Sequence, residues 1–321
     1  MRVLVTGGAG FIGSHVCERL VARGHEVVTV DNFDPFYDPA IKQRNLADLL
    51  ESGRFRLVVA DICDLPAVEE GVGDDAIDVI VHLAAKAGVR PSLEHPRAYV
   101  RANVDGTAAM LELARRRGIR PFVFGSSSSV YGESASVPFS ESDPAAHPIS
   151  PYAATKRAAE LVCHTYAHLY GLSVIALRFF TVYGPRQRPD LAIHKFARLM
   201  SEGRPVPFFG DGSTERDYTY VDDIVQGVEA AVDWARAARP GEFEVVNLGE
   251  SRTTTLARLV ELIAGALGVE PELDRQPAQP GDVPRTFANV DKARLLLGYD
   301  PRTPVEDGIP RFIEWFRSQP E

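Results

Sequence analysis

The chain has 321 residues, of which 45% are hydrophobic and 25% are charged. This is the composition of a globular protein with room for one large or two modest domains. The 44 acidic and 35 basic side chains give a formal charge of -9, which argues against nucleic acid or an anionic membrane as a partner. Only five of the basic residues are lysines, so each lysine invites inspection.

The three cysteines are far apart and have no metal-ligand spacing, so we expect neither a disulfide framework nor a bound metal. No basic segment leads into an apolar core near Met1, and no apolar run reaches the roughly 18 residues of a membrane span. The sequence therefore predicts a cytoplasmic protein without a membrane segment.

Short apolar runs alternate with helical patterns in the first half of the chain. This alternation predicts βαβ units and a doubly wound parallel sheet, the Rossmann type of α/β fold. The runs are residues 2–6, 26–30, 55–59, 77–82, 122–125 and 173–177.

The pattern becomes irregular after about Phe179, where prolines and glycines are frequent. We expect a first domain over residues 1–178 and a smaller C-terminal α/β domain over 179–321. A segment around 218–250, with a strand at 243–248, is expected to return to the sheet. The proline-rich stretch 271–284 predicts a loop before two short terminal helices.

Glycines follow the first strand at Gly7, Gly10 and Gly13, and a helix is predicted over 14–23. This spacing permits a tight turn and a close approach of the backbone to a pyrophosphate, with the helix N-terminus directed at the phosphates. A tight turn in an unrelated α/β protein is the alternative, but the flanking strand and helix favour a dinucleotide. The cofactor residues predicted here are Gly7, Gly10, Phe11, Ile12 and Gly13.

Asp31 ends the second strand, where a carboxylate accepts hydrogen bonds from the adenosine ribose and repels a 2'-phosphate. The cofactor is therefore predicted to be NAD rather than NADP. We assign Asn32 to the same end, and Asp61 and Ile62 to the adenine. A solvated aspartate at a strand end is the alternative for Asp61.

Tyr152 and Lys156 lie four residues apart on a predicted helix, and thus on one face of it. Ser150 suits the N-cap, Pro151 suits the first helical position, and Gly171 would end the helix. The helix dipole and the ammonium group should lower the pKa of Tyr152, which could then exchange a proton near neutral pH.

Four serines, 126–129, follow the fifth strand, at the edge of the sheet where such folds bind ligands. A polar loop is the alternative interpretation. Beside a Tyr/Lys pair at a dinucleotide site, however, the hydroxyls are better interpreted as part of an active site.

With these motifs the whole chain resembles the extended short-chain dehydrogenase/reductases that act on nucleotide sugars. The resemblance implies Ser127, Tyr152 and Lys156 as catalytic residues. It makes the first domain the NAD-binding domain and the second the nucleotide-sugar substrate domain. It adds to the cofactor site Leu83, Ala84, Ala85 and Asn103, beside Tyr152 and Lys156.

Residues 178–190 look most like those of UDP-glucuronate 4-epimerases, because UDP-galactose epimerases usually carry Asn in place of Thr181. The substrate is thus predicted to be a UDP-sugar. Arg188 and Arg216 are candidates for its diphosphate, since a guanidinium matches phosphate oxygens; solvated surface arginines are the alternative. The substrate residues predicted are Ser128, Ser129, Thr181, Arg188, Arg216 and Asp282.

One departure lies in the C-terminal loop, where several relatives hold the nucleotide with an arginine at the position of Gln279. Arg285 or Arg188 is the alternative source of that charge. The resemblance also implies a homodimer formed through the helical segments 102–117 and 152–170.

The predicted reaction is NAD-dependent 4-epimerisation of UDP-glucuronate and UDP-galacturonate through a 4-keto sugar. Related dehydratases place an Asp-Glu pair after the catalytic Thr, and UDP-glucuronate decarboxylases carry a Glu there, whereas this chain has Ser128 and Ser129. Alternatives are a UDP-glucose/UDP-galactose or N-acetylhexosamine 4-epimerase, then a decarboxylase or 4,6-dehydratase. A non-catalytic dinucleotide sensor is disfavoured by the intact catalytic residues.

Overall fold

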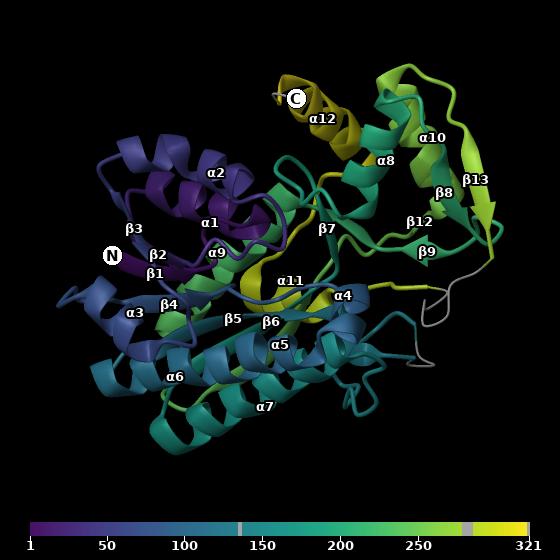
Figure 1. The fold of residues 1–321 in the computed structure, drawn as a ribbon. Helices are drawn as coiled ribbons and strands as arrows, with labels where there is room; N and C mark the ends of the chain where they lie inside the picture. Colours follow the sequence, from purple (N-terminus) through teal and green to yellow (C-terminus); the bar gives the residue numbers. More distant parts are fainter. Residues whose placement is uncertain (134–136, 278–284, 320–321) are drawn as a thin grey trace.

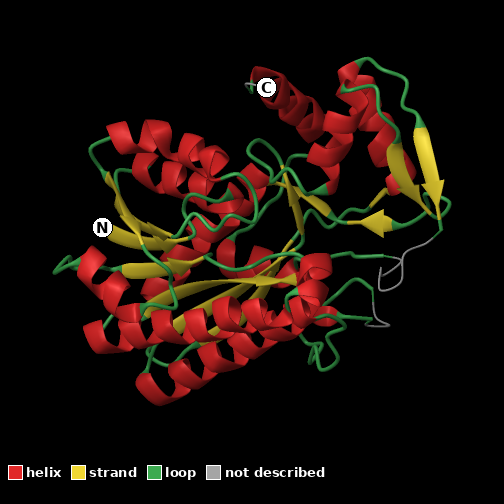
Figure 2. Ribbon diagram, in the orientation of Figure 1, coloured by secondary structure: helices red, strands yellow, loops and turns green. Residues whose placement is uncertain are grey.

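The computed structural model describes residues 1–133, 137–277 and 285–319. Within these residues a seven-stranded parallel sheet carries helices on both faces, and a smaller group of helices and strands lies beside it (Figures 1 and 2). The order of the strands is β11-β6-β5-β4-β1-β2-β3. The predicted doubly wound parallel sheet is therefore confirmed.

The sheet strands are apolar because helices cover them on both faces. Each begins and ends within two residues of the predicted run. They are β1 (Arg2–Thr6), β2 (Glu26–Asp31), β3 (Phe55–Val59), β4 (Val79–His82), β5 (Pro121–Ser127), β6 (Ser173–Phe179) and β11 (Phe243–Leu248).

Two hydrophobic clusters fill the space between the sheet and its two helical layers. One layer consists of α1 (Phe11–Ala22), α2 (Pro39–Glu51) and α9 (Val221–Ala237). The other consists of α3 (Leu65–Val72), α6 (Gly106–Arg117) and α7 (Pro151–Tyr170), seen along the lower side of Figure 1. The helix predicted to begin at residue 14 begins at Phe11, because Gly10 is already the N-cap.

Short helical segments connect these layers. They are α4 (Val89–Glu94), α5 (Pro96–Val100), a π-helical turn at Arg101–Asp105 and a 3-10 turn at Ser128–Tyr131. The predicted helix over 102–117 is thus irregular in its first turn and regular only from Gly106.

Beyond β6 the described residues form three small two-stranded pairings, β10 with β7, β12 with β9 and β13 with β8. The elements are β7 (Thr181–Tyr183), α8 (Ala192–Ser201), β8 (Val206–Phe209), β9 (Glu215–Arg216), β10 (Tyr218–Tyr220), β12 (Thr254–Thr255), α10 (Leu256–Leu267), β13 (Leu273–Gln276), α11 (Asp291–Leu297) and α12 (Val305–Ser318). The predicted loop over 271–284 is wrong in part, because β13 pairs in parallel with β8.

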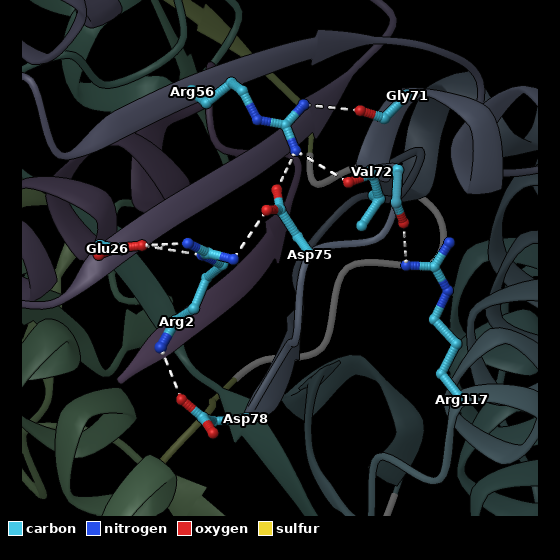
Figure 3. A network of polar contacts seen from close by, with 9 residues as sticks. Arg2, Glu26, Arg56, Gly71, Val72, Asp75, Asp78 and Arg117 are labelled. Atoms are coloured by element: carbon cyan, nitrogen blue, oxygen red, sulfur yellow. Dashed lines mark hydrogen bonds and ion pairs between the residues drawn. The ribbon is translucent and has the colours of Figure 1, made fainter.

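An ion-pair network joins the strands at their amino ends (Figure 3). The guanidinium group of Arg2 lies 2.6 Å from Glu26 and 2.7 Å from Asp75. Arg56 also pairs with Asp75 and donates to the carbonyl of Gly71. The network therefore ties β1, β2 and β3 to the turn before β4, at the end of the sheet opposite to the carboxyl ends of the strands.

A buried ion pair fixes α7 against the sheet. Both nitrogens Nε and Nη2 of Arg178 on β6 lie 2.9 Å from the Glu160 carboxylate on α7, and Ser126 on β5 donates to it at 2.6 Å. The Arg178 and Glu160 side chains are 2% and 0% exposed. Since an uncompensated buried charge is costly, this cluster specifies how three elements pack.

We predict that Glu160→Gln lowers the free energy of unfolding by about 3 kcal/mol or more, because Arg178 loses its buried counter-charge. Urea denaturation measures the change. Arg157→Gln, which removes the more exposed partner of Glu160, should cost less than about 1 kcal/mol. Equal effects of the two substitutions would contradict the role of burial.

Candidate active site

A cleft of about 550 Å³ lies at the carboxyl ends of the central strands. This is the edge where parallel sheets bind ligands. The cleft brings together most of the predicted residues from segments far apart in the sequence. Those lining it are Gly7, Gly10, Phe11, Ile12, Gly13, Asp31, Asn32, Asp61, Ile62, Leu83, Ala84, Ala85, Ser127, Ser128, Ser129, Tyr152, Lys156, Thr181 and Arg188.

The glycine turn between β1 and α1 leaves no space for side chains. A Cβ atom on Gly13 would stand 2.1 Å from the Gly7 carbonyl oxygen, and one on Gly7 would stand 2.7 Å from the Ala84 nitrogen. The N-cap Gly10 offers no side-chain cap, and the first turn of α1 contains no acidic residue. The helix N–H groups are therefore available to an anion, and the turn fits a pyrophosphate.

Asp31 occupies the end of β2 beside this turn. Its carboxylate accepts hydrogen bonds from the backbone N–H groups of Ala9, at 3.1 Å, and Phe33, at 2.8 Å. Burial raises the pKa of Asp31, while these bonds and the charge of Lys42 oppose the rise. The arrangement supplies the acceptor that a ribose requires at the adenosine end.

The catalytic candidates come from β5 and α7. Ser150 caps α7 by accepting from the Ala153 N–H at 3.1 Å, and the helix ends at Gly171, whose φ of 71° is left-handed. Tyr152 and Lys156 therefore share one helical face, and Tyr152 lies near enough to Ser127, at the end of β5, for the serine hydroxyl to favour the phenolate. The sequence predicted both caps of this helix.

The protonation of this pair differs from the prediction. Burial raises the pKa of Tyr152, and the Ser127 hydroxyl and the charge of Arg188 only oppose that rise. Burial also lowers the pKa of Lys156 to about 8, and its Nζ donates to the Gly125 carbonyl at 2.7 Å. The expected lowering of the Tyr152 pKa is therefore wrong, because desolvation outweighs the nearby positive groups.

Arg188 lies inside the cleft. Its Nε atom is 2.9 Å from Asp190, its Nη2 atom donates to the Ala87 carbonyl at 3.2 Å, and its guanidinium lies 5.0 Å from the centre of the Phe36 ring. The positive charge of Arg188 acts to lower the pKa of Tyr152. The alternative of a solvated surface arginine therefore does not apply to Arg188.

Two predicted residues in the described part of the chain, Asn103 and Arg216, are not among those lining the cleft. Asn103 lies behind it and bonds both the N–H and the carbonyl group of Lys86, at 2.8 and 2.9 Å. Arg216 is on β9 and donates to the carbonyl of Glu215. Asp282 and Gln279 lie outside the described residues.

Sequence reasoning missed a group of residues above the glycine turn. Two features of the sequence could have indicated these residues: the aromatic side chains that follow Asp31, and the small number of lysines. The missed lining residues include Asp34, Phe36, Tyr37, Lys42, Lys86 and Tyr99.

Comparison with known proteins identifies the family. Residues 3–249 match the NAD dependent epimerase/dehydratase family. The chain belongs to this family. The membership confirms the nucleotide-sugar enzyme family predicted from the motifs, and with it the predicted NAD dependence.

Relatives of this epimerase/dehydratase cover its whole length. It is 43% identical to a probable UDP-glucuronate 4-epimerase of Rhizobium meliloti, over 98% of this chain and 97% of the relative. A UDP-glucuronic acid 4-epimerase from Bacillus cereus, solved with UDP-glucuronic acid and NAD, is 35% identical, with a TM-score of 0.89 and 99% coverage of both chains. A UDP-glucose 4-epimerase from Thermotoga maritima, solved with UDP-glucose, is 34% identical, with a TM-score of 0.88 and the same coverage.

We predict that Gly13→Ala weakens NAD binding at least about tenfold, because its Cβ forces the glycine turn apart. Titration of the protein with NADH, followed by fluorescence, measures the affinity. The control is Gly265→Ala in α10, where no atom of the described residues lies within 4 Å of the added Cβ. This control should bind NADH normally and be slightly more stable. Unchanged affinity in Gly13→Ala would mean that the pyrophosphate binds elsewhere.

Proposed function

We propose that this epimerase/dehydratase interconverts UDP-glucuronate and UDP-galacturonate through a 4-keto sugar. The observation that carries the proposal is the set of hydroxyl side chains at the Tyr152 end of the cleft, formed by Ser127, Ser128, Ser129 and Thr181. The full-length likeness to UDP-glucuronate 4-epimerases supports it.

The glycine turn would hold NAD, which when bound would supply the acceptor for the hydride of carbon 4 and its source on return. Tyr152 is the group that removes the proton of the 4-hydroxyl and gives it back. Ser127 and Arg188 favour its phenolate, which burial alone disfavours. Lys156 sits one turn further along α7 and, with a pKa of about 8, is mostly charged at neutral pH.

A uronic acid with a ketone at carbon 4 is a β-keto acid, which tends to lose carbon dioxide. Neutral hydroxyl donors that fix the carboxylate would restrain its rotation and suppress that loss. Ser128 and Thr181 are our candidates for these donors. The acidic residues lining the described cleft are Asp31, which ends β2, and Asp34 and Asp61, which follow β2 and β3. None of them is on β5 or α7, the elements that carry Ser127 and Tyr152. This disfavours a dehydratase, which needs an acid beside the sugar.

The UDP group has to anchor the substrate while the sugar turns over. We propose Arg188 and Arg216 for the diphosphate, and Asp282 as a further substrate residue. Support is stronger for Arg188, which lines the cleft, than for Arg216 on β9.

Tyr152→Phe should lower turnover by about 10²- to 10⁴-fold or more, because the ring keeps its place but cannot transfer the proton. NADH binding should stay close to normal, which shows that the site is intact. Turnover is measured by separating the sugar epimers by chromatography. Half of the original activity in this variant would assign the base to another residue.

UDP-glucuronate should be converted to UDP-galacturonate, with UDP-pentose as a minor product. Ser128→Ala or Thr181→Ala should slow this conversion or release more decarboxylated sugar, since a buried carboxylate that loses a donor costs about 1 to 3 kcal/mol or more. Any reaction with UDP-glucose should be little affected, which makes it the matched control. Rapid epimerisation of UDP-glucose without reaction of UDP-glucuronate would establish the neutral-sugar alternative instead.

We also propose that the protein is a homodimer. Helices α5 and α7 lie side by side (Figure 1), and both carry exposed apolar side chains. They are Val100 on α5 and Leu161, Leu169 and Tyr170 on α7, with exposures of 48%, 53%, 60% and 50%. A second copy packed against these helices would cover them.

Leu161→Glu should therefore give a monomer, measured by light scattering on a sizing column, because the charge would be buried at the interface. Leu295→Glu is the matched control: Leu295 is 84% exposed on α11, away from these helices. If the Leu161→Glu protein is still a dimer and the Leu295→Glu protein is a monomer, the dimer interface lies on another face of the molecule.

In the part of the chain that the structure describes, no helix has the length and apolar character needed to cross a bilayer. The cytoplasmic location stays a prediction.

A further inference from the structure

An ion pair joins two loops above the glycine turn. The Lys86 Nζ atom, in the loop after β4, lies 2.8 Å from the Asp34 carboxylate, in the loop after β2. Both side chains line the cleft and are about 30% exposed. Neither residue has a role in the proposed chemistry.

The sheet topology determines what this pair crosses. β1 lies between β4 and β2, all three strands are parallel, and the glycine turn follows β1 directly (Figure 1). A bridge from the end of β2 to the end of β4 must therefore pass across the mouth of that turn. Since the turn fits the pyrophosphate, the pair spans the groove in which the dinucleotide lies.

The backbone at both ends of the bridge is held in place. Lys42 donates from Nζ to the Asp34 carbonyl at 2.9 Å, and Asn103 bonds the N–H and carbonyl groups of Lys86. Successive turns in which Asp31 and Asn32 accept N–H groups from Phe33 and Asp34 stiffen the loop further. The bridge can thus open by rotation of two side chains, without movement of the loops.

We propose that the Asp34–Lys86 ion pair is a clasp that retains NAD in the cleft between turnovers. The ion pair can slow the release of NAD whatever the reaction is. The benefit of slow release to the enzyme, however, rests on the proposed function. If the dinucleotide left while the sugar is a 4-ketone, the turnover could not be completed. A clasp that slows release favours epimerisation over release of an oxidised sugar.

The test measures how fast NADH leaves the purified protein, with no sugar present. Protein loaded with NADH is mixed with excess NAD, and the loss of bound NADH fluorescence gives the release rate. Lys86→Gln and Asp34→Asn should each speed release about two- to fivefold, as expected for loss of one partly exposed ion pair. The double variant should release NADH no faster than either single variant, because all three lack the same contact.

Salt and a matched pair provide the controls. Added sodium chloride should speed release from the unmodified protein more than from the variants, because only the unmodified protein has this ion pair for the salt to screen. Lys292→Gln should leave the rate unchanged; it breaks the Lys292–Glu244 pair, which is 2.6 Å long and similarly exposed, away from the cleft.

Two results would overturn the clasp. Unchanged release in both single variants would show that the pair does not obstruct NADH. Faster release in Lys86→Gln with slower release in Asp34→Asn would show that Lys86 binds the dinucleotide directly and that Asp34 competes for it. None of these measurements depends on which sugar is the substrate, so an incorrect sugar assignment leaves the test valid.

Discussion

The close contact between Gly13 and the Gly7 carbonyl is the constraint on which the rest of the site depends. It brings the start of α1 directly against the end of β1, so that backbone N–H groups form the floor of the cleft. A ligand bound there is held by main-chain groups. Side chains near the ends of neighbouring strands then determine which dinucleotide binds and which groups lie next to it. Asp31, Lys86 and Ser127 all reach the cleft because their strands end at the same edge of the sheet.

The sequence predicted those features that are local. The buried strands appeared as continuous apolar runs, and α7 was marked by Ser150, Pro151 and Gly171. It did not predict β13, because a four-residue strand in a proline-rich segment owes its existence to pairing with β8 rather than to its own residues. The residues above the glycine turn were missed for the same reason: Asp34 and Lys86 meet only after three strands are assembled.

The error about Tyr152 has a different physical origin. A helix N-terminus and a lysine four residues away are visible in the sequence, and both favour a phenolate. The depth of the cleft is not visible, and burial raises the pKa of Tyr152 while it lowers that of Lys156 to about 8. Burial thus disfavours the charged form of each group, although Lys156 stays mostly charged at neutral pH, and further positive charge near Tyr152 favours proton transfer. Arg188, brought in from the segment after β7, supplies such a charge.

The few lysines of the chain are concentrated in the cleft, and the chemistry of the ammonium group offers a reason. Three of the five lysines, Lys42, Lys86 and Lys156, line the cleft, whereas the surface ion pairs use mostly arginine. A guanidinium stays charged in almost any surroundings, but an ammonium group is compact and responds to burial. Burial lowers the pKa of both Lys42 and Lys156. A site that must hold an anionic dinucleotide and also transfer a proton benefits from cations whose charge its own surroundings can adjust.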